Sequence, residues 1–284
     1  MDRIKLNDGV TIPAIGFGTF RIPADGSTYR AVREALAAGY RHVDTASMYL
    51  NEEEVGRALR DSGIPRKDVF ITSKLWLTHY GYERAKVGIA RSLRKLATDY
   101  IDLYLLHQPY GDLAGAWKAL EEAQAAGVIR SIGVSNMTPN LWRAFLPNCT
   151  VTPSVNQIEC HPFCQQKAVR AVMAEAGVAV ECWGPLGQGN PELLGNEFLL
   201  DLARKYDKDV GQVILRFELQ EGMIVLPKSV REERIRSNLE IFDFALTEEE
   251  MEAIRAMDRN HPKRDPETPG VAELLLDKYP LGDD

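Results

Sequence analysis

Four polar side chains that could handle a proton together stand at the ends of short apolar runs. Asp44 and Tyr49 follow one such run, Lys74 closes the next, and His107 follows a third. An ammonium group near a phenol favours the phenolate and lowers the phenol pKa, while a nearby carboxylate keeps the ammonium charged. With an imidazole to bind an oxygen, the set is suited to donating a proton to an oxygen that gains negative charge. It supplies no hydride, so a reduction would need a cofactor.

A second group of residues at such ends offers a place for a flat ring that carries an amide. Trp183 offers a flat face on which a nicotinamide could stack, and Ser135, Asn136 and Gln157 could fix its carboxamide. Trp183 alone would more often be a core aromatic. Its place at a strand end, followed by Gly-Pro, favours the stacking role.

The last group is cationic. Lys228 and Ser229 are followed by Arg231 and Arg234 at the start of a helical pattern. Cations beside free helix N–H groups make a phosphate site. A 2′-phosphate on an adenosine ribose would fit this site, which favours NADPH over NADH. Interspersed glutamates leave a solvated helix face as the alternative.

Runs of strand length alternate with helical patterns along the chain, and this order must position those residues. The strand-like runs span 14–18, 42–43, 69–72, 101–106, 129–134, 154–158, 178–182 and 223–226. The helical patterns span 27–38, 52–61, 81–96, 113–126, 138–145, 165–175, 198–206 and 210–220, with a short one from about 231. Runs that look buried on both faces are typical of parallel sheets.

Eight such units fit either a (β/α)8 TIM barrel or a doubly wound open sheet. No Gly-x-Gly-x-x-Gly turn opens a helix, which favours the barrel. We therefore expect one barrel domain over residues 1–284, closed at one end by an N-terminal β-hairpin of runs 4–6 and 10–12. The polar strand ends would then share one face of the barrel. The segment after Asp258 would be a C-terminal tail over the surface or the site.

Composition and charge limit the partners and the cellular compartment that we expect for this protein. The net charge of −7 argues against a general nucleic-acid surface. The four cysteines do not form a secreted disulfide framework, and the first residues lack the apolar core of a signal peptide. No run is long enough to cross a membrane. We expect a cytoplasmic monomer that acts on a small molecule.

The motifs resemble those of one family almost end to end and in order. They are HVDTASMY (42–49), ITSKLW (71–76), LYLLHQP (103–109), IGVSN (132–136), VNQIECHP (155–162), WGPLGQG (183–189) and LPKSVREERIRSN (226–238). Together they resemble the aldo-keto reductases, with the closest resemblance to the bacterial 2,5-diketo-D-gluconic acid reductases and their relatives. The resemblance implies a barrel that reduces aldehydes or ketones with NADPH, diketo sugar acids and small dicarbonyls included.

The resemblance also implies roles for individual residues. Asp44, Tyr49, Lys74 and His107 would be the catalytic tetrad, with Tyr49 as the acid. The nicotinamide would be held by Ser135, Asn136, Gln157 and Trp183, and the 2′-phosphate by Lys228, Ser229 and Arg234. Asn238 would lie near the adenine. The substrate pocket would be lined by Phe20, Trp76 and Tyr110.

One residue departs from the pattern. Gln108 stands after the catalytic histidine, where many relatives have tryptophan. The change removes an aromatic wall or support, and the segment after it is short. We therefore expect an open and permissive substrate site.

Other interpretations remain at this point. Lys74 could be a Schiff-base nucleophile of a lyase, although a neighbouring carboxylate would keep it charged and unreactive. The chain could also be a non-catalytic nicotinamide-binding protein, or Asp44 and Lys74 a mere structural ion pair. Cys160, His161 and Cys164 invite a metal interpretation, but no second ligand pair has zinc-like spacing, so we expect no metal.

Overall fold

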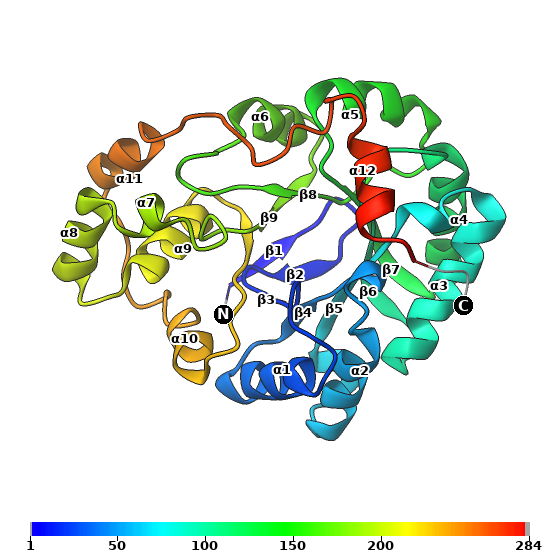
Figure 1. Cartoon of the computed structure of the whole chain (residues 1–284), viewed down its shortest axis with the longest axis horizontal. Helices are drawn as coiled ribbons and strands as arrows, with labels where there is room; N and C mark the ends of the chain where they lie inside the picture. Colours follow the sequence, from blue (N-terminus) through cyan, green and yellow to red (C-terminus); the bar gives the residue numbers. More distant parts are fainter. Residues whose placement is uncertain (1, 282–284) are drawn as a thin grey trace.

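The computed structural model of the protein describes residues 2–281 and contains eight parallel strands arranged in a ring (Figure 1). In order around the sheet, the strands are β3 (Phe17–Gly18), β4 (His42–Asp44), β5 (Phe70–Leu75), β6 (Ile101–Leu106), β7 (Ile129–Ser135), β8 (Val155–Glu159), β9 (Ala179–Trp183) and β10 (Ile224–Leu226). The sheet closes on itself because Gly16 N donates to Val225 O at 2.9 Å and Val225 N donates to Ala14 O at 2.9 Å. The predicted (β/α)8 barrel is confirmed.

Helices surround the strands and alternate with them along the chain. They are α1 (Ser27–Ala38), α2 (Glu52–Asp61), α3 (Tyr82–Leu96), α4 (Leu113–Ala125), α5 (Pro139–Phe145), α6 (Lys167–Glu175), α7 (Pro191–Leu194), α8 (Glu197–Tyr206), α9 (Val210–Gln220), α10 (Glu232–Ser237), α11 (Glu248–Arg255) and α12 (Val271–Lys278). Three of them, α7, α11 and α12, were not predicted. Among residues 2–281, no helix has both the length and the apolar character that a membrane crossing requires.

Burial explains why these runs became strands and helices. Every residue of β5 and β6 is buried, as expected for strands covered by helices outside and by core side chains inside. In α3 the buried residues are Ala85, Gly88, Ile89, Ser92 and Leu96, a spacing of three and four that forms one helix face. The eight units therefore hold the strand ends in fixed positions.

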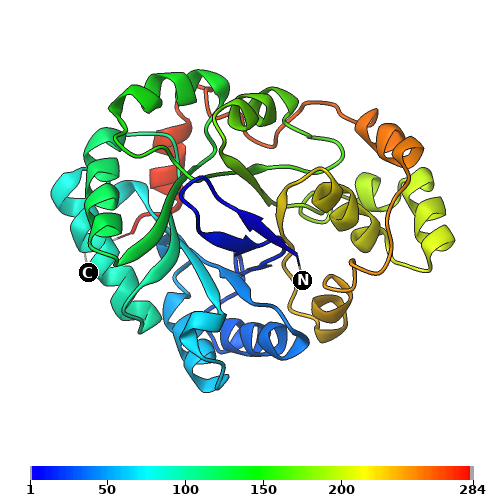
Figure 2. The ribbon, with the colours of Figure 1, turned by 180° about the vertical axis from the view of Figure 1, so that it is seen from behind.

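An antiparallel hairpin of β1 (Arg3–Lys5) and β2 (Thr11–Pro13) lies across one end of the barrel, as Figure 2 shows. Its turn needs Gly9, which has φ +89°. Leu6 and Ile12 are buried in one cluster with strand side chains such as Phe70 and Leu103. The hairpin is thus the expected plug, and it closes the end opposite α12 (Figures 1 and 2).

The hairpin is also fastened by polar contacts, which gives a first prediction. Asp8 Oδ2 accepts hydrogen bonds from the hydroxyls of Ser131 at 2.7 Å and Ser154 at 2.8 Å. We expect Asp8→Ala to lower the free energy of unfolding by about 1–3 kcal/mol, because two hydrogen bonds to a charged group are lost. Urea denaturation measures this loss, and kcat/KM should not change because Asp8 is far from the strand ends. An unchanged unfolding midpoint would show that the hydrogen bonds of Asp8 do not contribute to stability.

The segment that follows α11 crosses the other end of the barrel. Trp76 Nε1 donates to Tyr279 O at 3.1 Å, and the Tyr110 hydroxyl donates to Pro266 O at 2.8 Å. Glu267 accepts a hydrogen bond from Asn140 Nδ2 at 3.0 Å. The tail expected after Asp258 therefore covers the mouth where the strands end, and it carries α12 (Figure 1).

Candidate active site

The first four predicted residues meet at the mouth. Asp44 ends β4, Tyr49 ends the 3₁₀ turn η1 (Ser47–Tyr49), Lys74 lies near the end of β5, and His107 follows β6. Lys74 Nζ lies 2.7 Å from both carboxylate oxygens of Asp44 and donates to the Tyr49 hydroxyl at 3.3 Å. The rings of Tyr49 and His107 are 5.6 Å apart, edge to face. Phenol, ammonium, carboxylate and imidazole thus form one group.

Lys74 is a fixed positive charge inside this group. Its side chain is fully buried, and Nζ also donates to Thr45 O at 2.8 Å. Burial is the largest single influence and lowers the pKa of Lys74, but attraction to Asp44 and Tyr49 and the hydrogen bond to Asp44 together exceed it, so the net direction is upward. The ammonium therefore stays protonated and directed at the tyrosine oxygen.

The phenol and the imidazole both stay neutral near neutral pH. Burial raises the pKa of Tyr49 to about 12, although the Lys74 charge pulls it down. The expected lowering by Lys74 is present, but desolvation exceeds it, so the net direction of the Tyr49 pKa is upward instead of downward. Burial, followed by repulsion from Lys74, holds the pKa of His107 well below its usual range. A protonated phenol beside a neutral imidazole gives two groups that can meet a carbonyl oxygen.

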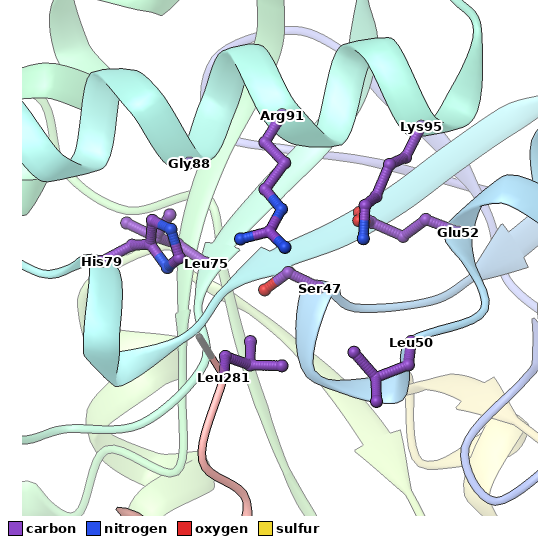
Figure 3. A pocket seen from close by; sticks show the side chains of 9 residues that line it. All are labelled: Ser47, Leu50, Glu52, Leu75, His79, Gly88, Arg91, Lys95 and Leu281. Carbon is purple, nitrogen blue, oxygen red and sulfur yellow. The ribbon is translucent and has the colours of Figure 1, made fainter. Parts of the chain in front are cut away.

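The turn that carries Tyr49 is supported from behind. The Ser47 hydroxyl donates to Lys74 O at 2.9 Å, which joins η1 to β5. A cavity of about 10 Å³ lies between η1 and α3, and Figure 3 shows Arg91 reaching into it toward Ser47. This volume suits a single water molecule and is too small for a substrate.

The four residues predicted to hold the nicotinamide lie beside the tetrad, at the ends of β7, β8 and β9. Trp183 Nε1 donates to Asn136 Oδ1 at 2.9 Å, and the Ser135 hydroxyl donates to Gln157 O at 2.8 Å. Asn136 has φ +61°, a left-handed conformation that asparagine tolerates better than most residues. The Trp183 ring is thus held, partly exposed, next to the backbone and side-chain amides.

Gln157 is fixed from inside the barrel by two carboxyl groups. Its Nε2 donates to Asp44 Oδ2 at 2.9 Å and to Glu181 Oε2 at 2.6 Å. The side chain of Gln157 therefore joins the predicted nicotinamide residues to the tetrad.

The predicted phosphate residues lie together after β10. Lys228 and Arg234 are exposed, and neither forms an ion pair with another residue in the range 2–281. Ser229 accepts a hydrogen bond from Arg231 N at 3.0 Å, and the buried Asn238 ends α10. Two cations without carboxylate partners remain available to an anion.

The predicted substrate residues surround the tetrad, but two of them also hold the tail. The Phe20 ring lies 5.0 Å from that of Tyr49, and the Trp76 ring lies 5.1 Å from that of His107. Trp76 is fully buried because Tyr279 covers it, and Tyr110 is bound by its hydroxyl to the tail. These two side chains therefore set the position of the covering segment.

The side chain of Gln108, the residue that departs from the family motif, faces Asn136. Its Oε1 accepts from Asn136 Nδ2 at 3.4 Å, and its backbone N–H and carbonyl both bond the Tyr80 hydroxyl, at 3.0 and 2.8 Å. The amide of Gln108 thus adds a partner for Asn136.

Comparison with known protein families shows to which family this chain belongs. The family described as "Aldo/keto reductase family" matches residues 14–259. The chain belongs to this family. It is 43% identical over 259 residues to an aldo-keto reductase of Mycolicibacterium smegmatis, covering 90% of this chain and 93% of that one. It is 42% identical to the glyoxal reductase of Bacillus subtilis, covering 91% and 94%.

A solved structure extends this aldo-keto reductase comparison to the cofactor. The Bombyx mori aldo-keto reductase, in complex with NADP, superposes with a TM-score of 0.87 at 35% identity, covering 98% of this chain and 97% of that one. NADP(H) is the cofactor of the family. The residues of this aldo-keto reductase fit it: a partly exposed indole stands beside fixed amides, and Lys228 and Arg234, which form no ion pair within residues 2–281, follow β10. The closer resemblance to the 2,5-diketo-D-gluconic acid reductases stays a prediction.

Three neighbours of the aldo-keto reductase site were not predicted. Thr45 supplies its carbonyl to Lys74. Arg21 lies near Lys228 and, after burial, is the second cause that lowers the pKa of that lysine. Glu181 binds Gln157. Only Glu181 had a sequence signal, as an ionisable residue within the apolar run 178–182.

Proposed function

We propose that this aldo-keto reductase uses NADPH to reduce aldehydes and ketones to alcohols, with Tyr49 as the proton donor. The observation that carries the proposal is the contact of Lys74 Nζ with the Tyr49 hydroxyl at 3.3 Å, with Asp44 bound to the same ammonium. A phenol that is protonated at neutral pH and touches a fixed positive charge can give up its proton to an oxygen that becomes negative.

The chain's residues then have separate roles. Tyr49 gives its proton to the carbonyl oxygen, and the ammonium of Lys74 stabilises the phenolate that remains. Asp44 holds that ammonium in place, and neutral His107 orients the carbonyl by a hydrogen bond. NADPH, when bound, supplies the hydride that no side chain can provide.

Other residues would hold the cofactor and the substrate. Trp183 would stack on the nicotinamide, with Ser135, Asn136 and Gln157 at its carboxamide. Asn238 would lie near the adenine. Phe20, Trp76 and Tyr110 would form the walls around the carbonyl.

We propose small aldehydes and dicarbonyls as the first substrates to test, with diketo sugar acids beside them. The 42% identity to a glyoxal reductase supports dicarbonyls. The amide of Gln108, in place of a bulky indole, supports a mouth that accepts several carbonyl compounds.

A Schiff-base reaction at Lys74 has less support. An imine needs an uncharged amine with room for a carbonyl carbon. Lys74 is fully buried, its pKa is raised, and Nζ already faces Asp44, Thr45 and Tyr49.

The phosphate site provides the test of the proposed function. We expect the wild type to oxidise NADPH in the presence of an aldehyde and dicarbonyl panel, and to prefer NADPH to NADH. The double variant Lys228→Ala/Arg234→Ala should raise KM for NADPH by about 10–100-fold, because two charge-assisted contacts to phosphate are lost. KM for NADH should change by less than about threefold, because NADH has no 2′-phosphate.

A matched control is the pair Arg60→Ala/Lys86→Ala, which removes two exposed cations from the outer helices. It should leave both values as in the wild type. Equal losses for NADPH and NADH in the double variant would contradict the phosphate assignment. No oxidation with any carbonyl would contradict the proposed function itself.

A further inference from the structure

A buried carboxyl group lies in the barrel below the tetrad. Glu181 is the middle residue of β9 and is fully buried. Its Oε2 accepts the 2.6 Å hydrogen bond from Gln157, and its Oε1 lies 3.7 Å from His42 Nε2 and has no hydrogen-bond partner among the described residues. No step of the proposed reaction uses this residue.

The charges inside the barrel show which form of Glu181 is stable. Around Glu181 stand the carboxyl of Asp44 and the imidazole of His42 on β4, the ammonium of Lys74 on β5 and the phenol of Tyr49 on η1. The single ammonium is already bound to Asp44 at 2.7 Å. A second carboxylate would therefore be buried without a counter-charge, which is unfavourable.

His42 does not provide that counter-charge. Its Nε2 lies 2.9 Å from the Thr72 hydroxyl and is farther from Glu181, at 3.7 Å. Burial, followed by repulsion from Lys74, lowers the pKa of His42 to about 3. The neutral imidazole leaves Glu181 as a protonated acid.

The orientation of Gln157 follows from its two carboxyl neighbours. A carboxylate only accepts hydrogen bonds, so the amide nitrogen of Gln157 must face Asp44. Its second N–H is directed to Glu181. The remaining group, Oε1, has no partner in residues 2–281 and is left to accept a hydrogen bond from a bound amide.

We propose that Glu181, held in its protonated form, is a positioning residue that locks the Gln157 amide between the cofactor site and Asp44. The proposal rests on the proposed function, since it assigns Gln157 to the nicotinamide carboxamide. Glu181 touches neither substrate nor cofactor. It joins the group that holds the cofactor to the group that moves the proton.

A dependence on pH follows. Burial, followed by repulsion from Asp44, raises the pKa of Glu181 to about 8. Above that pH, Glu181 becomes a second negative charge near Tyr49, which raises the pKa of the phenol and makes it a weaker acid. kcat/KM for reduction should then decline as the pH rises from 8 to 9, by at most about tenfold per pH unit.

Two variants of Glu181 separate charge from packing. Glu181→Gln keeps an acceptor for Gln157 but cannot ionise, so it should lose most of the decline of kcat/KM between pH 8 and 9. Glu181→Leu removes the acceptor and should weaken NADPH binding by about tenfold, the effect of one lost hydrogen bond. Fluorescence titration gives the NADPH Kd, and steady-state kinetics give the pH profile.

Glu218 offers a matched control. It is also fully buried, neither of its carboxyl oxygens has a partner in the described chain, and it lies in α9, on the outer layer. Glu218→Gln should keep the wild-type pH profile, and Glu218→Leu should keep the wild-type NADPH Kd. If the Glu181 variants behave like the Glu218 variants in both measurements, Glu181 only fills the core and the proposal is overturned.

A third measurement does not depend on catalysis. A glutamate whose pKa is raised in the folded state loses stability as the pH rises from its ordinary value of 4.5 to about 8, because the unfolded chain releases the proton first. The unfolding temperature of Glu181→Gln should therefore rise relative to wild type across this range. A constant difference would show that Glu181 is ionised and would overturn the proposal, whereas failure of carbonyl reduction in the wild type would overturn the proposed function alone.

Discussion

Tyr49→Phe should lower kcat for carbonyl reduction by a factor of about 10³, within the 10²–10⁴ range of a positioned general acid. The change removes one oxygen, which is the atom that faces Lys74 Nζ. The ring remains against Phe20 and His107, so the shape of the mouth is kept. The measurement is steady-state NADPH oxidation with an aldehyde in excess.

Two comparisons make the Tyr49→Phe result specific. The NADPH Kd should stay within about twofold of wild type, because no contact to a cofactor group is assigned to the phenol. Tyr104→Phe removes another buried hydroxyl, one that bonds Ser92 at 2.9 Å away from the mouth, and should keep kcat. Normal turnover by Tyr49→Phe would refute the proposed proton donor.

Lys74→Met should reduce both stability and activity. It leaves the buried carboxylate of Asp44 without its counter-charge, and breaking a buried ion pair in this way costs about 3–5 kcal/mol. kcat should fall by at least about 10²-fold, because no positive charge remains to stabilise the phenolate of Tyr49. Chemical denaturation and steady-state kinetics measure the two effects.

The double variant Lys74→Met/Asp44→Asn separates these effects. Removing the stranded charge should recover about 1–3 kcal/mol of the lost stability. It should not recover kcat, since the ammonium is still missing. If Lys74→Met alone were as stable as wild type, Asp44 would be protonated or would have another counter-charge, and the description of the buried pair would be wrong.

The sequence predicted the parts that depend on local pattern. Buried runs such as 101–106 and the order of eight strand and helix units were enough for the barrel. Because parallel strands end on one face, the polar residues after them, such as Asp44 and His107, were correctly expected to meet. The capping box of Thr247 and Glu250, which begins α11, is a local sequence signal for a helix outside the eight predicted units.

The missing parts depend on contacts between distant segments. The covering of Trp76 by Tyr279 joins residues 203 positions apart, and no local pattern encodes it. The pKa of Tyr49 depends on burial by several elements, so the lysine alone did not determine its net direction. The link from Glu181 through Gln157 to Asp44 likewise crosses the barrel.

The hairpin plug has a practical consequence for handling the enzyme. The hairpin lies at the end of the barrel that faces away from α12 (Figure 2), and its strand β1 carries the exposed residues Arg3 and Lys5. Attachment of the protein to a solid support through Lys5 would point its catalytic opening toward the surrounding liquid. The hairpin is therefore a suitable attachment point for an immobilised biocatalyst.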